Sequence, residues 1–271
     1  WTLRRYGCTW LTARRQPPRV SALAAIAVIP LAYVLATFYL PLLILFAESV
    51  RWEGLGTYSG VFLNPDYLSV IGYSLTLAVL TTSLTFLIAL PAAYHLAFNV
   101  DDEAVKSRLL VLFTVPMLVN FLLRTYALMN ILSFFGLTGT YAGMVIGMVY
   151  EFLPYMLLPL YSTFERIERR YLEAAQTLGA RPAQTFLRVT LPLAIPGVAS
   201  GVALVFLMSF TEFIVPAMLG GVYGYTVGYL IWDLFLKFRN WPAGSALAFV
   251  VTLASLLIVY AYARWGLGYE A

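Results

Sequence analysis

Apolar and polar positions alternate along this chain in long blocks. The apolar blocks cover residues 21–46, 68–98, 109–128, 141–161, 193–219 and 243–263. Each is close to the ~20 residues that an α-helix needs to cross a bilayer. The block 68–98 is longer than one crossing requires, so part of it should lie outside the hydrocarbon. The pattern predicts an all-α integral membrane protein with six transmembrane helices.

Prolines and one short apolar piece modify this prediction. Pro30 and Pro41 lie inside the first block and are expected to bend or end its helix. Residues 126–135, which follow Arg124, are expected to form an interfacial or broken helix. Small residues four apart on the fourth and fifth helices, Gly143/Gly147 and Gly197/Gly201, allow close helix approach, within the chain or against a second subunit.

Composition supports the membrane assignment and excludes several chemistries. Of 271 residues, 61% are hydrophobic and 11% charged, whereas soluble domains carry roughly 25% charged residues. The single cysteine (Cys8) and single histidine (His95) argue against a disulfide framework, a metal site and a Ser-His-Asp triad. No phosphate-binding loop motif occurs, so we expect no enzymatic activity and no cofactor on this chain. The net charge of +4 does not indicate nucleic-acid binding.

The distribution of Lys and Arg predicts the orientation. With a cytoplasmic N-terminus, 13 of the 17 Lys and Arg residues lie on the inner side, and 4 (Arg51, Arg124, Lys237 and Arg239) on the outer side. Because positive residues accumulate in cytoplasmic loops, both termini are predicted to be cytoplasmic. The expected organisation is a basic cytoplasmic segment (1–20), one transmembrane domain (21–265) and a short tail (266–271). A signal peptide is the weaker alternative for the first block, which is long and has no clear cleavage site.

The polar interval 164–192 is predicted to be a cytoplasmic helix–turn–helix between the fourth and fifth spans. Ile167, Tyr171, Ala174/Ala175 and Leu178 recur at helical spacing and form one apolar stripe. Glu165 and Arg169, four residues apart, are expected to support that helix. Gly179 suits the helix C-cap, and Pro182 the first turn of a second short helix that runs to Leu191-Pro192.

The same interval carries a family resemblance. Glu173-Ala174-Ala175, three residues, Gly179, nine residues, Val189, one residue and Leu191-Pro192 resembles the EAA loop of bacterial ABC importer permeases, with Val189 where the family usually has Ile. The resemblance implies that Glu173, Ala174, Ala175, Gly179, Leu191 and Pro192 couple the permease to an ATPase. The bland alternative is an ordinary connector between two membrane helices.

Two further segments resemble the spermidine/putrescine permeases within that family. They are Pro116 to Tyr126 (PMLVNFLLRTY) and Asn240 to Ala246 (NWPAGSA). The resemblance implies a polyamine importer of the bacterial inner membrane with several partners: a second permease subunit expected to be a paralogue, a cytoplasmic ATPase dimer that binds ATP and Mg, and an external solute-binding protein. Permeases for sulfate, ferric iron and aminophosphonates share parts of these segments and remain alternatives.

Acidic residues inside the apolar blocks are candidates for the substrate pathway. Glu151 lies in the fourth helix and Glu212 in the fifth, and a carboxylate in hydrocarbon needs a partner or water. Glu151 either lines the pathway or pairs with Asn120, Arg124 or Asn130. Glu212 is favoured for the pathway, where an anion suits a cationic substrate.

The loop 220–244 is expected to form an amphipathic helix at the outer interface, with aromatic residues around Asp233, Lys237 and Arg239. Phe213, Trp232 and Asp233 join the candidate pathway residues. A proton-coupled carrier that uses Glu151, Glu212 and His95 is the alternative class of function. It does not account for the interval 164–192.

Overall fold

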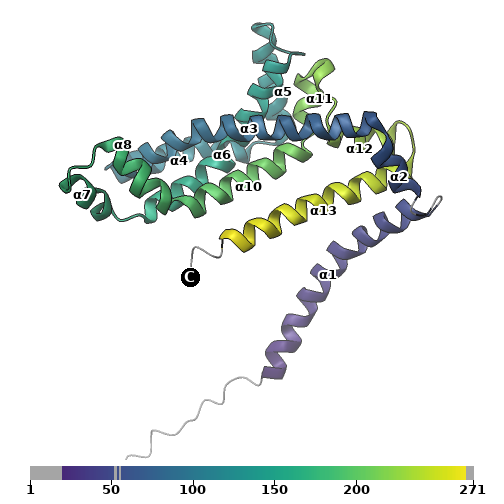
Figure 1. Ribbon diagram of the computed structural model, residues 1–271, viewed down its shortest axis with the longest axis horizontal. Helices are drawn as coiled ribbons and strands as arrows, with labels where there is room; N and C mark the ends of the chain where they lie inside the picture. Colours follow the sequence, from purple (N-terminus) through teal and green to yellow (C-terminus); the bar gives the residue numbers. More distant parts are fainter. Residues whose placement is uncertain (1–19, 52–53, 55, 267–271) are drawn as a thin grey trace, which may run out of the picture. The chain divides into compact units, whose positions relative to one another are not determined.

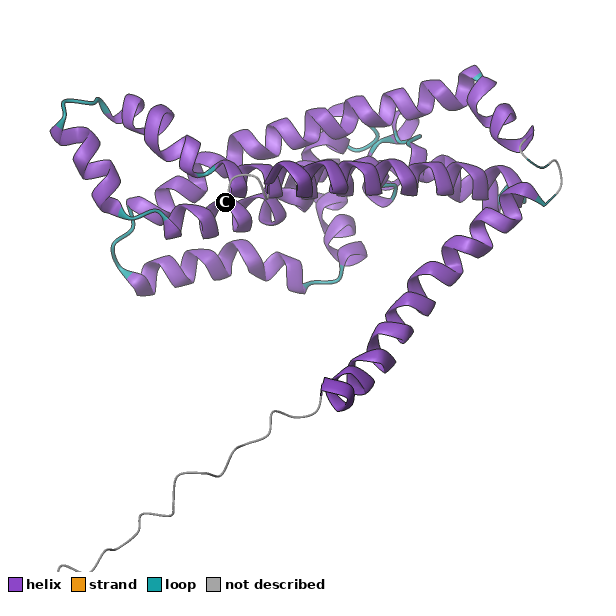
Figure 2. Cartoon of the chain, turned by 60° about the horizontal axis from the view of Figure 1, so that its bottom comes forward, coloured by secondary structure: helices purple, strands orange, loops and turns teal. Residues whose placement is uncertain are grey.

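The computed structural model describes residues 20–51, 54 and 56–266, and the described part is helical throughout, without strands (Figures 1 and 2). The longer helices are α1 (Val20–Val50), α3 (Pro65–Phe98), α4 (Glu103–Leu118), α5 (Phe121–Phe134), α6 (Tyr141–Arg166), α10 (Ile195–Thr211), α12 (Val227–Leu236) and α13 (Trp241–Gly266). The shorter ones are α2 (Gly56–Leu63), α7 (Arg169–Thr177), α8 (Pro182–Thr185), the π-helix η1 (Phe186–Thr190), α9 (Leu191–Leu193), α11 (Ile214–Leu219) and the 3-10 turn η2 (Gly221–Tyr223).

Four of the described helices are long and apolar enough to cross a membrane: Val28–Val50, Pro65–Phe98, Tyr141–Arg166 and Trp241–Ala261. Two bent helix pairs bring the number to as many as six. They are Glu103–Leu118 with Phe121–Phe134, bent by 101°, and Pro182–Leu193 with Ile195–Thr211, bent by 70°. The all-α membrane fold is confirmed, while the count of six spans and their orientation stay predictions.

Two of the predicted spans are not continuous helices. The span predicted over 109–128 is interrupted at Val119 and Asn120, between α4 and α5. The span predicted over 193–219 is interrupted at Glu212 and Phe213, between α10 and α11. The expected broken piece at 126–135 lies in α5 except for its last residue, Phe135, which is the C-cap. Each break contains one polar residue, Asn120 or Glu212, inside an otherwise apolar block, and the average hydrophobicity of the block does not reveal it.

The chain divides into two compact units, residues 1–47 and 48–271, and most of α1 belongs to the first. This helix runs through Pro30 and Pro41 without interruption, so neither proline ends it. Most of its side chains from Val28 to Phe46 are exposed and apolar, as a helix that faces lipid or a partner helix requires. The predicted cytoplasmic segment 1–20 and the tail 266–271 lie almost entirely outside the described residues.

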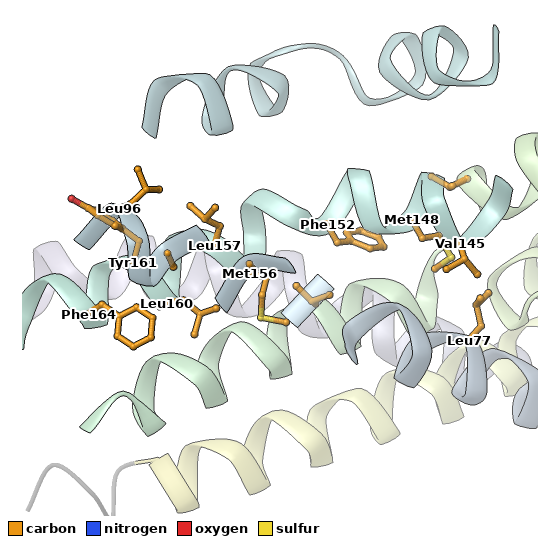
Figure 3. Packing of buried hydrophobic residues seen from close by; sticks show 14 of the residues in the cluster. Leu77, Leu96, Val145, Met148, Phe152, Met156, Leu157, Leu160, Tyr161 and Phe164 are labelled. Atoms are coloured by element: carbon orange, nitrogen blue, oxygen red, sulfur yellow. The ribbon is translucent and has the colours of Figure 1, made fainter. Parts of the chain in front are cut away.

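The core of the second unit is built on α6, which packs against α3 and α10. Met148, Phe152 and Met156 on α6 are fully buried between these helices (Figure 3). Glycines allow the close approach: a Cβ at Gly197 would lie 2.2 Å from Thr163 Oγ1, and one at Gly201 would lie 2.9 Å from Met156 Sδ. The small residues on α10 therefore serve packing within the chain.

Different short helices lie at the two ends of this unit. The short helices α7 and α8 lie at one end of the long helices, and α2 and α12 at the other (Figure 1). Between them, α5 and α11 pack side by side, and Gly139 N, in the loop after α5, donates to Leu219 O of α11 at 2.8 Å. A Cβ at Gly147 of α6 would lie 2.3 Å from Leu219, so α11 also packs closely on α6.

Candidate functional site

The predicted helix–turn–helix is present in the interval 164–192. Helix α7 ends at Thr177, and Gly179 has φ +86°, in the left-handed region that favours glycine. Pro182 occupies the first turn of α8, which continues through η1 into α9 at Leu191 and Pro192. The local prediction of a glycine turn between two short helices is therefore confirmed.

The start of this segment differs from the prediction. Helix α6 ends at Arg166 with Ile167 as its C-cap, and α7 begins only at Arg169. Glu165 thus belongs to a different helix from Arg169, and the expected i,i+4 pair between them is wrong. Arg169 instead pairs with Asp101 at 2.7 Å, and Glu165 with Lys106 at 3.2 Å.

One face of α7 is uncovered in this chain. Leu172 is buried, whereas Glu173 and Ala174 are exposed and Ala175 is half-buried. Leu178, at the end of the predicted apolar stripe, is 89% exposed. Leu191 is half-buried and Pro192 exposed. An exposed apolar stripe with a carboxylate beside it is a surface that a partner protein can cover.

Several contacts tie this segment to the long helices. Lys106 of α4, whose side chain is 8% exposed, pairs with Glu165 of α6 and with Glu103 of α4, the latter at 3.1 Å. The rings of Tyr94 (α3) and Phe186 (η1) meet edge to face, with centroids 5.3 Å apart. The Tyr94–Phe186 contact therefore links η1 to α3, and the Arg169–Asp101 pair links α7 to the loop before α4, while Lys106 holds α4 against α6.

Glu151 lies on the buried face of α6 and forms an ion pair with Arg124 of α5. Both side chains are almost fully buried. Arg124 also donates from a second guanidinium nitrogen to Pro116 O at 2.6 Å, across the break between α4 and α5. Of the alternatives left open by the sequence, this geometry supports pairing with Arg124, and a pathway role for Glu151 stays a prediction.

Glu212 lies at the break between α10 and α11 and caps the second helix. Its Oε1 accepts hydrogen bonds from the backbone N–H groups of Phe213 (3.0 Å), Ile214 (2.7 Å) and Val215 (3.3 Å). Its own carbonyl accepts from Thr226 Oγ1 at 3.0 Å. The carboxylate therefore satisfies backbone donors that the break exposes, a role that the sequence reasoning missed.

A cavity of about 410 Å³ lies beside this break. Its lining is almost entirely apolar: Thr211, Phe213, Val227, Gly228, Ile231, Trp232, Phe235, Leu236 and Val251. The structure thus brings together two of the predicted pathway residues, Phe213 and Trp232. Glu151, Glu212 and Asp233 do not line this cavity.

Helix α12 forms where an amphipathic helix was predicted, but its charge lies on the inner face. Asp233 is 1% exposed, and its Oδ2 lies 3.6 Å from Lys237 Nζ. Burial, together with the nearby Asp233 carboxylate, raises the pKa of Tyr225 to about 12. Ser74 of α3 anchors the start of this helix by accepting from Val227 N at 2.7 Å. Asp233 is therefore a packed residue in this chain, and its pathway role stays a prediction.

Within the described ranges, no group of three or more His, Cys, Asp or Glu side chains is placed to hold a metal ion.

Comparisons with known proteins agree with the resemblance found in the sequence. Residues 86–265 match the model of the binding-protein-dependent transport system inner membrane component family. The spermidine/putrescine transport system permease protein PotB of Haemophilus influenzae is 37% identical over 226 residues, covering 76% of this chain and 77% of that protein. PotB of Escherichia coli is 34% identical over 219 residues, covering 74% and 79%.

A solved bacterial ABC transporter involved in the import of the acidic polysaccharide alginate has the same fold. Its matched chain superposes with a TM-score of 0.72 at 18% identity, covering 91% of this chain and 95% of that one. The match to the family model extends from α3 to α13 and includes the EAA-like segment. The chain therefore belongs to the binding-protein-dependent transport system inner membrane component family, as a multi-pass permease subunit of the bacterial inner membrane.

Proposed function

We propose that this permease forms half of the translocation pathway of an ATP-driven importer for polyamines such as spermidine and putrescine. The observation that carries the proposal is the identity of 34–37% to PotB proteins over about three quarters of the chain. The second half of the pathway is a paralogous permease, an external solute-binding protein delivers the polyamine, and ATP and Mg bind to a cytoplasmic ATPase dimer.

The exposed face of α7 is the proposed ATPase contact. Tyr171, Ala174 and Leu178 supply an apolar surface, and Glu173 supplies a charge beside it. Closure of the ATPase dimer on ATP displaces this segment as a wedge, and the Tyr94–Phe186 and Arg169–Asp101 contacts carry the displacement to α3 and to the loop before α4. Coupling is then a shift between inward-facing and outward-facing states. It requires both termini to be cytoplasmic, as the charge distribution predicts.

The proposed pathway runs past the break between α10 and α11. All three hydrogen bonds of the Glu212 carboxylate use Oε1, which leaves Oε2 for a substrate ammonium group. Phe213 and Trp232 add aromatic faces, which attract cations by roughly 0.5–2 kcal/mol each. This combination suits a polyamine better than sulfate or an aminophosphonate, the two anionic substrates among the alternatives, which also include ferric iron.

Reconstitution tests both levels of the proposal. The chain is assembled with its partner permease, ATPase and binding protein in liposomes, and spermidine uptake is measured with ATP, without ATP and with a proton gradient alone. Uptake that requires ATP supports the importer. Uptake driven by the proton gradient without the ATPase would support the carrier alternative.

Two variants in α7 and its turn test the coupling surface. Glu173→Lys reverses the charge on the exposed face, and Gly179→Leu places a side chain at φ +86°, a backbone that costs a non-glycine residue about 1–2 kcal/mol. Both variants are expected to insert normally but to lose ATPase co-purification or ATP-dependent uptake. Thr177→Ser, an exposed change on the same helix, serves as the control. Normal uptake by both variants would show that this face does not couple to the ATPase.

A further inference from the structure

A second cavity, of about 230 Å³, lies at the end of the molecule opposite α7. It is lined by Thr57, Gly60, Val61, Asn64, Tyr67, Asn240, Pro242 and Ala243, from α2 and from the first turns of α3 and α13. Three of these residues belong to the segment Asn240 to Ala246, for which neither coupling nor the proposed pathway provides a role. The cavity is several times the ~30 Å³ that one water molecule occupies, so it has room for a phosphate group.

The polar groups in this cavity present hydrogen-bond donors. Asn64 Oδ1 accepts from Asp66 N at 2.9 Å, and Asn240 Oδ1 accepts from Ala243 N at 3.2 Å. Because each amide oxygen is used in capping a helix, each amide turns its NH₂ group, which can only donate, to the remaining side. Two asparagines with this orientation favour a ligand with acceptor oxygens.

A buried hydroxyl points to the same conclusion. Thr57 is 6% exposed, and its Oγ1 is buried without a hydrogen-bond partner in the described structure. An unsatisfied buried hydroxyl is unfavourable by roughly 1–3 kcal/mol in proteins, which a ligand oxygen in the cavity would relieve. This observation is independent of the two helix caps.

The electrostatic environment favours an anion. The cavity is bordered by the N-terminal ends of α3 and α13, which carry partial positive charge. Lys237 and Arg239 are exposed and shortly precede Asn240. Among the residues that the structure describes, no carboxylate lines the cavity, and the nearby Asp66 is exposed.

The depth of the cavity identifies the source of the anion. The candidate spans Pro65–Phe98 and Trp241–Ala261 both begin here, so the cavity lies at the level where hydrocarbon meets water. Trp241 is 55% exposed and Phe238 58%, and aromatic side chains collect at this interface. From these observations we propose that the cavity between α2, α3 and α13 binds the headgroup phosphate of a membrane phospholipid.

The proposal is tested on the assembled complex, purified in detergent and depleted of lipid. Phospholipid retained before depletion is counted by native mass spectrometry. The depleted complex is then titrated with short-chain phosphatidylglycerol, with a diacylglycerol that has no phosphate, and with inorganic phosphate, while the midpoint of thermal unfolding is followed. We expect retained phospholipid in the wild type, and a rise in the midpoint with phosphatidylglycerol that the other two compounds do not reproduce.

Variants that keep the helix caps make the test specific. Asn240→Asp retains the capping oxygen but replaces the donor NH₂ with a negatively charged acceptor, so phosphatidylglycerol should bind at least about tenfold more weakly. Thr57→Val removes the unsatisfied hydroxyl, so it should raise the midpoint without lipid and reduce the gain on adding it. Asp102→Asn, the reverse exchange at the cap of α4, is the matched control and should leave lipid binding unchanged.

Each remaining outcome would overturn the proposal. An equal response to phosphatidylglycerol in the wild type, Asn240→Asp and Thr57→Val would show that the lipid binds elsewhere. A full shift with inorganic phosphate would indicate a site for free anions, and a full shift with diacylglycerol would indicate acyl-chain binding. Variants that keep the lipid response but lose the co-purified solute-binding protein would assign the cavity to an acidic protein surface. Should Asn240→Asp not assemble, Thr57→Val decides alone.

Discussion

Both interrupted spans have a charged side chain at the break, but the two charges have different partners. At the break between α4 and α5, Arg124 donates to Pro116 O and pairs with Glu151 on α6. At the break between α10 and α11, Glu212 accepts from three N–H groups of the residues that immediately follow it. At the first break the cation adds a second hydrogen bond to a carbonyl that also accepts from Val119 N. At the second break the anion accepts from the N–H groups at the start of α11.

These different partners indicate that one break is rigid and that the helices at the other break can move. Arg124 of α5 joins α4 and α6 and is buried, so moving it would leave the Glu151 carboxylate without its cation in a low-dielectric region. Glu212 is half-buried and the hydrogen bonds of its carboxylate are local, so α11 and its cap can move together. We expect the break between α4 and α5 to be a rigid support and the break between α10 and α11 to be the adjustable part of the pathway.

The largest effect is expected from Arg124→Met. This change leaves Glu151 buried without its cation, and loss of one partner of a buried pair costs roughly 3–5 kcal/mol. We therefore expect loss of the assembled complex, measured as the yield of permease that co-purifies with the ATPase and as the midpoint of thermal unfolding.

The double variant Arg124→Met/Glu151→Met is the control for this prediction. Removing both charges leaves no buried ion, and Pro116 O keeps its hydrogen bond from Val119 N at 3.2 Å, so most of the assembly should return. If Glu151 also lines the pathway, the double variant should assemble well but take up the polyamine slowly. If Arg124→Met alone assembled normally, the break between α4 and α5 would not depend on this ion pair.

A smaller effect is expected from Glu212→Leu, which removes the cap of α11. Loss of a capping acceptor costs about 1–2 kcal/mol, so the variant should assemble with a lower midpoint of thermal unfolding than the wild type. A decrease as large as that of Arg124→Met would mean that Glu212, too, holds distant segments together.

Glu212→Gln separates the cap from the charge. Glutamine keeps an acceptor oxygen for α11 but removes the negative charge, so the midpoint should fall less than in Glu212→Leu. Polyamine uptake should nevertheless slow about tenfold, the equivalent of ~1.4 kcal/mol on the barrier. Wild-type uptake in a well-assembled Glu212→Gln complex would leave Glu212 with the capping role alone.

These two breaks also mark the limit of what the sequence predicts. The long apolar blocks predict the helices, and the positions of Gly179 and Pro182 predict the turn between two short helices. Both features depend only on local sequence and backbone preference. The partners Arg124 and Glu151 are 27 positions apart in the chain and meet only when α5 packs on α6. Arg124 was one of three candidate partners for Glu151, and tertiary packing was needed to choose among them.

The same dependence on tertiary structure explains why Glu165, Arg169 and Glu212 have partners that the sequence did not predict. Glu165 and Arg169 are four positions apart, but α6 ends at Arg166 and Arg169 begins α7. The spacing therefore does not place the two side chains on one helix face. Glu212 has the composition of a pathway residue and, in addition, the position of a cap, which is visible only once the chain turns extended at that residue. An acidic residue in an apolar block therefore predicts that a partner exists, while the fold decides which one.

The smallest expected effect comes from Thr226→Val, which tests how firmly the second break is tied to α12. Thr226 Oγ1 donates to the Glu212 carbonyl at 3.0 Å, and Thr226 is buried at the start of α12. Valine has the same shape without the donor, so the loss should be about 1 kcal/mol, measured as a small decrease in the midpoint of thermal unfolding. If this break is the adjustable part of the pathway, uptake should also change while the amount of co-purified ATPase does not, because α12 would follow α11 less closely.

Ser74→Ala is the comparison variant for this prediction. It removes the other hydrogen bond at the start of α12, from Val227 N to Ser74 Oγ, without touching Glu212. Equal effects of the two changes on uptake would show that α12 responds to its anchoring on α3, and the break between α10 and α11 would lose its distinction from the rigid one.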